Sequence, residues 1–432
     1  MQSLLIALLL ALGCGSLFSN PYVPGRKQDH PILLKGGDLY TISHGILMNT
    51  DLLFEQGRIT QIGANLTVPA NAEVIDVTGR RIYPGLIDAA SGLGLVEIDA
   101  IRATKDNAEV GPIHPEVQSL IAYNPDSEII PTVRSNGILL ALVAPEGGVI
   151  SGRAALMKLD GWTREDCVEK PDAALQLNWP QAAIITAWWN ERTPEEQKKE
   201  MAESRERLRE SFRTARAYYL ARKAGTQKEV DLRWEAMMPI FDGTMPVYVN
   251  ANDVRQIEEA VYFAKEQNIR IVIAGGREAY RVAGLLKENN VPVVLGRTQL
   301  LPFREDDDYD ISYKLPKLLQ DAGVKFSFSY GYATWASRSL PFQAAQAVAF
   351  GLDPDVALRS LTLTSAEILG VDQELGSLDV GKKATLIVSE GDILDPISQR
   401  VTHAFIDGKK VDLNNRHKQL YEKYRQKTYP ND

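Results

Sequence analysis

Short apolar segments alternate with amphipathic segments through the middle of the chain. Two apolar runs, 137–144 and 153–159, are predicted to be buried strands. Four further runs are strand-like: 246–250, 269–276, 291–296 and 324–330. Each is followed by a stretch whose apolar residues have helical spacing. Apolar strands that alternate with helices indicate a parallel sheet covered by helices. The length and repetition favour a closed (β/α)8 TIM-like barrel over an open sheet in this α/β chain.

Both ends of the chain have a different pattern, with short β-branched runs separated by Gly, Asn and Asp turns. We expect the two flanks to meet in one small β-sandwich beside the barrel. The predicted organisation is an export segment at 1–19, the first half of the sandwich at 20–83, the barrel at 84–370, and the second half with a terminal helix at 371–432. The fourth barrel strand, between about 173 and 187, is the one that the pattern places least well.

A charged helical segment, 193–225, interrupts the barrel pattern. It begins with the capping box Thr193-Pro194-Glu195-Glu196, and Gly225 is a typical helix stop. Its apolar residues recur with helical spacing along one face: Met201, Leu208, Phe212, Ala215 and Tyr219. We favour a helix packed on its own barrel. The alternative is an arm, 194–224, that docks an active paralogue or a second copy of the chain.

The composition is that of a soluble globular protein, with 44% hydrophobic and 24% charged residues among 432. A net charge of −8 argues against nucleic acid as a partner, since no basic stripe is available to neutralise phosphates. The two cysteines are Cys14 and Cys167. Cys14 lies in the predicted export segment, so we expect no disulfide, and Cys167 is expected to be a structural or surface thiol.

The N-terminal segment predicts export. Residues 4–13 form an apolar run of signal-peptide length, too short to span a bilayer, and small residues follow it. We therefore expect a periplasmic or secreted protein, with lipid anchoring at Cys14 as the minor alternative. The mature chain has no segment apolar enough to cross a membrane.

Long phrases from both flanks resemble the amidohydrolase superfamily, particularly its exported imidazolonepropionase-like branch. The first phrase is "FEQGRITQIGANLTVPANAEVIDVTGRRIYPGLIDA", and the second begins "PFQAAQAVAFGLDPDVALRSLTLTSAEILGVDQELGSLDVGKKATLIV" and continues into "VTHAFIDGKKV". The resemblance covers roughly 31–90 and 240–410 and is weak between 95 and 235. It implies a catalytic barrel, a small β-sandwich and hydrolysis of C–N bonds with one or two divalent metal ions such as zinc.

The same resemblance assigns metal ligands to positions where this chain has other residues. The HxH pair after the first barrel strand is replaced by Ala90 and Gly92, which lack ligand atoms. The histidine of strand 5 falls on Asn250, and that of strand 6 on Ala274 or the adjacent glycine. The aspartate after strand 8 falls on Tyr330 or the next glycine. We therefore expect no metal centre of the family type and no other cofactor.

Other polar residues remain available near the predicted barrel mouth. Of five histidines only His114 lies outside the two flanks, in an unusually long first loop. The candidates for acid–base catalysis or ligand binding are His114, Asp88, Glu116, Arg153 and Asn250. The simpler interpretation is that these are surface charges and strand-end caps, with His114 anchoring its loop.

Three functions follow from these observations. The first is a non-catalytic amidohydrolase homologue, or pseudoenzyme, that binds a ligand or a partner. The second is an active hydrolase of C–N bonds, in a peptide-like or cyclic amide, with a rebuilt site at the barrel mouth. The third is a structural protein that assembles through the helix 194–224. The first is favoured because all recognisable ligand positions are altered together while the barrel and sandwich phrases persist.

Overall fold

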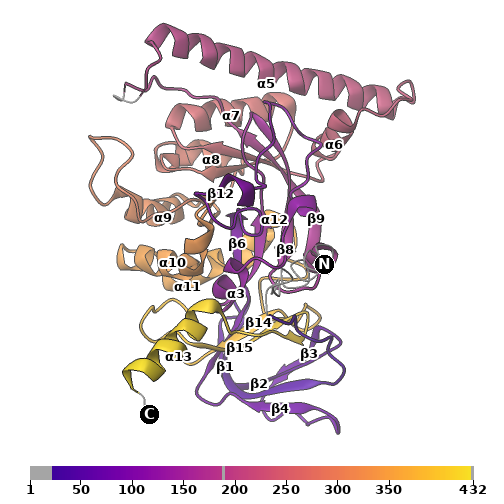
Figure 1. Cartoon of the computed structure of the whole chain (residues 1–432), viewed down its shortest axis with the longest axis vertical. Helices are drawn as coiled ribbons and strands as arrows, with labels where there is room; N and C mark the ends of the chain where they lie inside the picture. The colour runs from indigo at the N-terminus through magenta and orange to yellow at the C-terminus, as the bar shows by residue number, and fades with distance from the viewer. Residues whose placement is uncertain (1–21, 187–189, 430–432) are drawn as a thin grey trace, which may run out of the picture.

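The computed structural model describes residues 22–186 and 190–429, so the predicted export segment lies outside the described residues. Two eight-stranded sheets organise this part of the chain (Figure 1). Within it, no helix combines the length and the apolar character needed to cross a bilayer.

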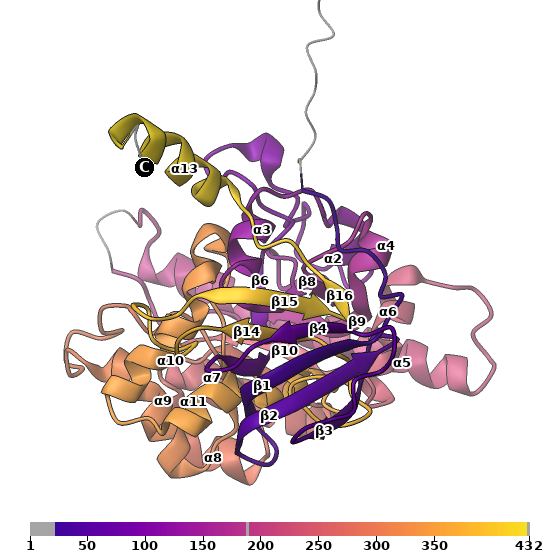
Figure 2. The same ribbon diagram turned by 90° about the horizontal axis from the view of Figure 1, so that it is seen from below.

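The small β-domain is built from both ends of the chain, as predicted. Its strands are β1 (Ile32–Tyr40), β2 (Ile46–Glu55), β3 (Arg58–Gly63), β4 (Glu73–Asp76), β5 (Arg81–Pro84), β14 (Leu386–Ser389), β15 (Val401–Ile406) and β16 (Lys409–Lys410). Figure 2 shows β14 and β15 beside the N-terminal strands, and β14 pairs antiparallel with β5. The Phe54 and Phe405 rings meet edge to face at 5.0 Å in its core, which therefore joins the two flanks.

Strand β1 explains how a predicted sandwich forms one continuous sheet. Its first half pairs with β4 and its second half with β5. The register against β2 shifts between Leu34 and Gly37, where Gly36 has a φ of +74°. Such a bulge bends a strand and increases its twist. Strand β1 therefore pairs with β4 along its first half and with β5 along its second half, and both belong to one sheet.

The second sheet is the predicted barrel. Its strands, in sheet order, are β6 (Leu86–Ser91), β7 (Ile138–Val143), β8 (Ile150–Lys158), β9 (Val168–Asn178), β10 (Val247–Ala251), β11 (Ile271–Gly275), β12 (Val293–Leu295) and β13 (Phe326–Phe328). A bridge between Ser91 and Gly331 brings β6 next to the end of β13 and nearly closes the sheet. The predicted fold class is confirmed.

One barrel strand departs from the predicted parallel arrangement. Strand β8, which contains the predicted run 153–159, is antiparallel to both β7 and β9. The cause is its short connection: a parallel return needs a crossover of a dozen or more residues, whereas only 144–149 join β7 to β8. Gly147 and Gly148 have φ values of +82° and +62°, which suit a tight turn. The fourth strand, poorly placed by its sequence, is β9.

Helices and loops cover the barrel. Those before β10 are η1 (Arg102–Thr104), α2 (Ser119–Ala122), α3 (Ile129–Arg134), α4 (Arg164–Cys167), α5 (Pro194–Lys223) and α6 (Leu232–Phe241). Those after it are α7 (Val254–Gln267), η2 (Ala279–Val282), α8 (Ala283–Glu288), α9 (Ile311–Ala322), η3 (Thr334–Ser339), α10 (Leu340–Ala349), α11 (Pro354–Ser360), α12 (Leu363–Leu369) and α13 (Arg416–Thr428). The long predicted loop between β6 and β7 therefore contains η1, α2 and α3.

The predicted inserted helix is α5, which lies across the end of the molecule opposite the small β-domain (Figure 1). Its capping box is formed, with Thr193 and Glu196 each accepting the other's backbone N–H. Phe212 is fully buried and meets Phe263 of α7 at 5.0 Å, and Arg205 forms two hydrogen bonds to Glu259 of the same helix. The apolar face of α5 is thus used by its own chain.

Candidate functional site

The carboxyl ends of the parallel strands define one end of the barrel, called the mouth below. At this end the side chains of Asn250 on β10 and Asn178 on β9 form a hydrogen bond of 2.9 Å. Asn178 also donates to the carbonyls of Gly147 and Gly148 and to Ser151 Oγ, at 3.2, 3.0 and 3.1 Å. An amide pair thus ties β9 and β10 to the β7–β8 turn. Asn250, a predicted candidate, is held by neighbours of its own chain.

Gly92 stands where the sequence resemblance predicts the second histidine of an HxH pair, and its surroundings leave little room for a side chain. A Cβ at this position would lie 3.2 Å from Cδ1 of Tyr332 and 3.3 Å from Cγ2 of Thr334. Such distances are shorter than normal van der Waals contacts, so the ring of Tyr332 would have to move. The chain has filled this space with an aromatic ring.

The other family ligand positions also offer no metal-binding set. Ala90 and Ala274 have no donor atom, the Asn250 amide is bonded to Asn178, and Tyr330 contributes a buried phenol. Within residues 22–186 and 190–429, no three His, Cys, Asp or Glu side chains gather where they could hold a metal ion together. The side chains present therefore do not fit the family's metal centre, whose donors are imidazole and carboxylate.

Asp88 is a fully buried carboxyl between β6, the end of β13 and η3. Its Oδ1 accepts weakly from the backbone N–H groups of Ala90 and Tyr330, at 3.5 and 3.4 Å, and among the described residues Oδ2 has no partner with normal hydrogen-bond geometry. Burial raises the pKa of Asp88 to about 7, although those backbone groups and the hydroxyl of Ser337 oppose the shift. A ligand cannot reach this side chain without a local opening, because it has no exposed surface.

His114, Glu116 and Arg153, three of the sequence candidates, lie close together at the rim. The loop residue Ile113 pairs with Ile150 of β8, beyond the end of β7. His114 Nδ1 lies 3.6 Å from a Glu116 carboxylate oxygen, and its Nε2 lies 2.9 Å from the Val110 carbonyl. Arg153 donates to the Glu116 carbonyl and to the carboxylate of Asp172. His114 thus holds its own loop, and among the described residues no hydrogen bond or ion pair joins this group to Asp88.

Sequence reasoning missed Glu146, which lies three residues after the end of β7. Burial raises its pKa to about 7, against the opposing effect of Lys105, and Asn107 donates to it at 2.5 Å. The hydroxyl of Tyr332 donates to the adjacent Pro145 carbonyl at 3.3 Å. Its position in the sequence could have revealed it, because an acidic residue shortly after a barrel strand lies at the mouth.

A buried charge network fixes the loops after β10, β11 and β12. The carboxylate of Glu278 has no exposed surface and accepts from the guanidinium of Arg304 and from the backbone N–H of Val254, the latter at 2.8 Å. Arg304 also donates to Asp253 at 3.2 Å, and Arg281 lies 3.3 Å from Glu278. Three strand-end loops are therefore joined by charge-assisted hydrogen bonds.

Two arginines at the mouth also escaped sequence reasoning. Arg277 follows β11 and Arg297 follows β12, each in a Gly-Arg dipeptide two residues after the strand ends. A repeated Gly-Arg at two neighbouring strand ends was the signal that could have revealed them. Cys167, by contrast, is as expected: it is buried, and burial raises the pKa of its thiol to about 12.

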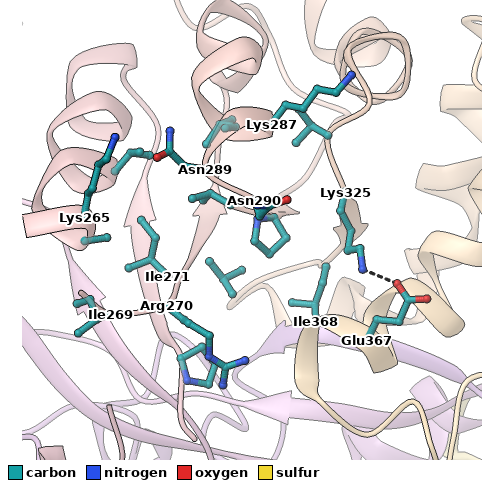
Figure 3. A pocket seen from close by; sticks show the side chains of 18 of the residues that line it. Lys265, Ile269, Arg270, Ile271, Lys287, Asn289, Asn290, Lys325, Glu367 and Ile368 are labelled. Carbon is teal, nitrogen blue, oxygen red and sulfur yellow. Dashed lines mark hydrogen bonds and ion pairs between the residues drawn. The ribbon is translucent and has the colours of Figure 1, made fainter. Parts of the chain in front are cut away.

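A large pocket lies at the opposite end of the barrel (Figure 3). The amino-terminal ends of β10 to β13 and the helices α7, α8 and α12 line it, and its cations include Arg270, Lys287 and Lys325. Lys325 is paired with Glu367 at 2.7 Å, and in the figure the other labelled cations point away from one another. In barrels this end contributes to stability and the carboxyl end carries activity. The candidate site is therefore the mouth.

Comparisons with known proteins agree with the architecture. Residues 240–411 match the sequence profile of the amidohydrolase family. The amidohydrolase tasK of Hapsidospora irregularis is 25% identical over 390 residues, which are 83% of this chain but only 39% of tasK. A dihydroorotase of Geotalea daltonii is 47% identical over 57 residues, 13% of each protein. A crystal structure of an amidohydrolase from Thermotoga maritima superposes with a TM-score of 0.78 and 26% identity, covering 88% of this chain and 99% of that one.

Proposed function

Because this chain belongs to the amidohydrolase superfamily, we propose that it is a non-catalytic member whose barrel mouth binds a ligand or a partner. The observation that carries the proposal is the packing of Tyr332 against Gly92, where the family has a metal-binding histidine. Because the ring fills the space that a metal-binding side chain would need, the mouth is better suited to binding a ligand than to metal-assisted hydrolysis.

The remaining ligand positions support the same proposal. Ala90 and Ala274 cannot bind a metal, and Asn250 is engaged by Asn178. Hydrolysis of an amide needs an activated water, which the family obtains from a metal-bound water with a lowered pKa. With these side chains the mouth retains hydrogen-bonding and charged groups, which suit recognition of a ligand.

Metal analysis of the purified chain tests the proposal. We expect less than about 0.1 zinc, manganese or iron per chain, and no rise in melting temperature when zinc is added, because a bound ion would stabilise the folded state. We also expect no hydrolysis of N-acyl amino acids or cyclic amides above the rate of buffer. About one bound metal per chain together with hydrolysis would overturn the proposal.

The second candidate is an active hydrolase of C–N bonds with a rebuilt site. One observation favours it: Glu146 and Asp88 both have pKa values raised by burial to about 7, the range in which a carboxyl can exchange protons at neutral pH. Glu146 is the stronger candidate because it is partly exposed at the mouth, whereas Asp88 is inaccessible. His114, on the rim, is the other candidate base.

Activity measurements with two variants separate the candidates. If the chain hydrolyses an amide, Glu146→Gln or His114→Ala should lower kcat about 100-fold or more, since general acid–base catalysis contributes that much. Asp106→Asn, a change at an exposed carboxylate in the same long loop, is the matched control and should leave kcat unchanged. Hydrolysis that survives both changes would remove this candidate.

A further inference from the structure

A small cavity of about 10 Å³, enough for one water molecule or one ligand oxygen, lies between the loops that follow β11 and β12. Its lining includes the two Gly-Arg arginines, two glycines and one threonine: Gly275, Arg277, Gly296, Arg297 and Thr298. The backbones of the two glycines approach closely, with a hydrogen bond from the Gly296 N–H to the Gly275 carbonyl. Gly275 has a φ of +94°, and a Cβ there would lie 2.6 Å from Oδ1 of Asn252. Residues without side chains are therefore required where the two loops meet.

Arg277 is held in place without being neutralised. Its guanidinium donates to the Leu301 carbonyl at 2.7 Å and lies over the ring of Phe303 at 4.6 Å. Among the described residues no carboxylate forms an ion pair with it, and burial lowers its pKa. A guanidinium has five N–H donors, so most of them remain available. Arg277 is thus a fixed cation with spare donors at the mouth.

Arg297 provides a second cation on the same cavity. It is exposed, and no hydrogen bond or ion pair involves its side chain in the described part of the chain. Its positive charge acts on the neighbouring Tyr330, whose pKa is raised by burial and lowered in part by this arginine. Two cations from adjacent strand ends therefore face one cavity, in a protein with a net charge of −8.

Thr298 adds an independent observation. It is only 3% exposed, and its backbone N–H donates to Gln343 at 2.8 Å, which fixes its position. Its hydroxyl has no hydrogen-bond partner in the described residues, although it is buried beside the cavity. A buried hydroxyl without a partner is costly, and a ligand oxygen accepting its proton would remove that cost.

Asp307 is the one carboxylate among the described residues that line the cavity, and its oxygens are bonded to other groups. Asp307 is paired with Arg281 at 2.5 Å, accepts from the hydroxyl of Tyr280 at 3.1 Å, and accepts from the Arg304 N–H at 3.0 Å. Both of its oxygens are therefore in use, and Arg281 balances its charge. Asp307 and Glu278 also attract Arg277 and partly oppose the lowering of its pKa by burial, but among the described residues neither forms an ion pair with Arg277 or Arg297.

We propose that a carboxylate or phosphate group of the ligand binds at the opening of this cavity, with Arg277 and Arg297 pairing with the anion and the Thr298 hydroxyl donating a hydrogen bond to one of its oxygens. The inference rests on the proposed function, namely that the mouth binds a ligand. Arginine suits this task because its planar donors match the two oxygens of a carboxylate or phosphate. The anionic group fixes the ligand between the ends of β11 and β12.

Titration calorimetry with two probes tests the inference on the full chain. Inorganic phosphate and acetate are titrated separately in a low-salt buffer, since screening weakens exposed charge pairs. We expect at least one of them to bind, and the tighter probe identifies the anion as phosphate or carboxylate. Arg277→Gln and Arg297→Gln should each raise the dissociation constant about 10- to 100-fold, as expected for hydrogen bonds to a charged group.

Thr298→Val separates ligand recognition from a structural role. It should weaken binding of the same probe about fivefold or more while leaving the unfolding transition unchanged or raised, because an unpartnered hydroxyl is removed. Arg270→Gln is the matched control: Arg270 is also an exposed arginine that forms no ion pair with any described residue, but it precedes β11 in the pocket of Figure 3. It should leave the dissociation constant unchanged within about twofold.

Two results would overturn the inference: neither probe binds, or Arg270→Gln abolishes binding while Arg277→Gln and Arg297→Gln do not. The second result would place the anion site at the other end of the barrel. Bound metal with amide hydrolysis would overturn the proposed non-catalytic function but leave this cavity's anion binding intact. The two failures are thus distinguishable.

Discussion

The ring of Tyr332 packs against Gly92, so that a Cβ at residue 92 would lie 3.2 Å from Cδ1 of the tyrosine. The backbone of Gly92 is outside the left-handed region, so the lack of a side chain reflects space and not backbone conformation. The Tyr332 hydroxyl also donates to Pro145 after β7. One aromatic residue therefore fills the space beside Gly92 and connects the end of β6 to the segment after β7.

The first prediction concerns the space at Gly92. Gly92→Ala should lower the free energy of unfolding by about 1–3 kcal/mol, because the added methyl group overpacks against Tyr332 and Thr334. Urea denaturation measures the change. Gly284→Ala is the control: a Cβ there meets nothing within 4 Å, and in α8 it should stabilise by up to about 1 kcal/mol. A neutral Gly92→Ala would show that the ring moves away without cost.

The second prediction is a pH dependence from Asp88. Its pKa is about 7 in the folded chain against 3.8 for an ordinary aspartate, so the folded state binds a proton that the unfolded state has released. The stability that protonated Asp88 provides is full below roughly pH 4 and is lost as pH rises through about 7. The total loss is roughly 4 kcal/mol, at 1.36 kcal/mol per pKa unit.

Asp88→Asn should remove this dependence. Between pH 5 and 8 the free energy of unfolding of the wild type should fall relative to the variant by about 3 kcal/mol, measured by urea denaturation at each pH. Asp106→Asn controls for the loss of one negative charge on an exposed side chain. Parallel pH profiles for the wild type and Asp88→Asn would contradict the prediction.

The fold could be predicted because its determinants are local patterns. The apolar runs around Val249 and Ile273 and the N-terminal phrase that ends in Ala89 specify strands and turns directly. The reversed direction of β8 was not predicted, since an apolar run such as 153–159 is equally consistent with either direction. Only the shortness of the 144–149 connection reveals it.

The candidate site was less predictable, because its relationships are between residues far apart in sequence. The contact between Gly92 and Tyr332 depends on the closure of the barrel at Ser91 and Gly331. Likewise, an unpartnered Thr298 hydroxyl is a property of three-dimensional packing and has no signature in composition or spacing. His114 and Glu116 were found because they are close in sequence and lie on one loop.

The third prediction concerns the buried charge network at the mouth. Arg304→Met should lower the free energy of unfolding by about 3 kcal/mol, because the fully buried Glu278 would lose its main cationic partner. Limited proteolysis should also cut the 296–310 loop faster. Arg297→Met, in the same loop but without an ion pair, should change stability by less than about 0.5 kcal/mol. Equal effects of the two changes would mean that the network does not hold the loop.

The fourth prediction decides between the two interpretations of α5. Phe212 is buried between α6 and α7, so Phe212→Ala should destabilise the chain by about 3–5 kcal/mol. Leu220, on the same helix, is 58% exposed, and Leu220→Ala should change stability by less than about 0.5 kcal/mol. If α5 only covers its own barrel, the molar mass by light scattering will be the same for the wild type and Leu220→Asp. A lower mass for Leu220→Asp, with unchanged stability, would instead establish the outer face of α5 as an interface with another subunit, because a charge buried in such an interface is costly.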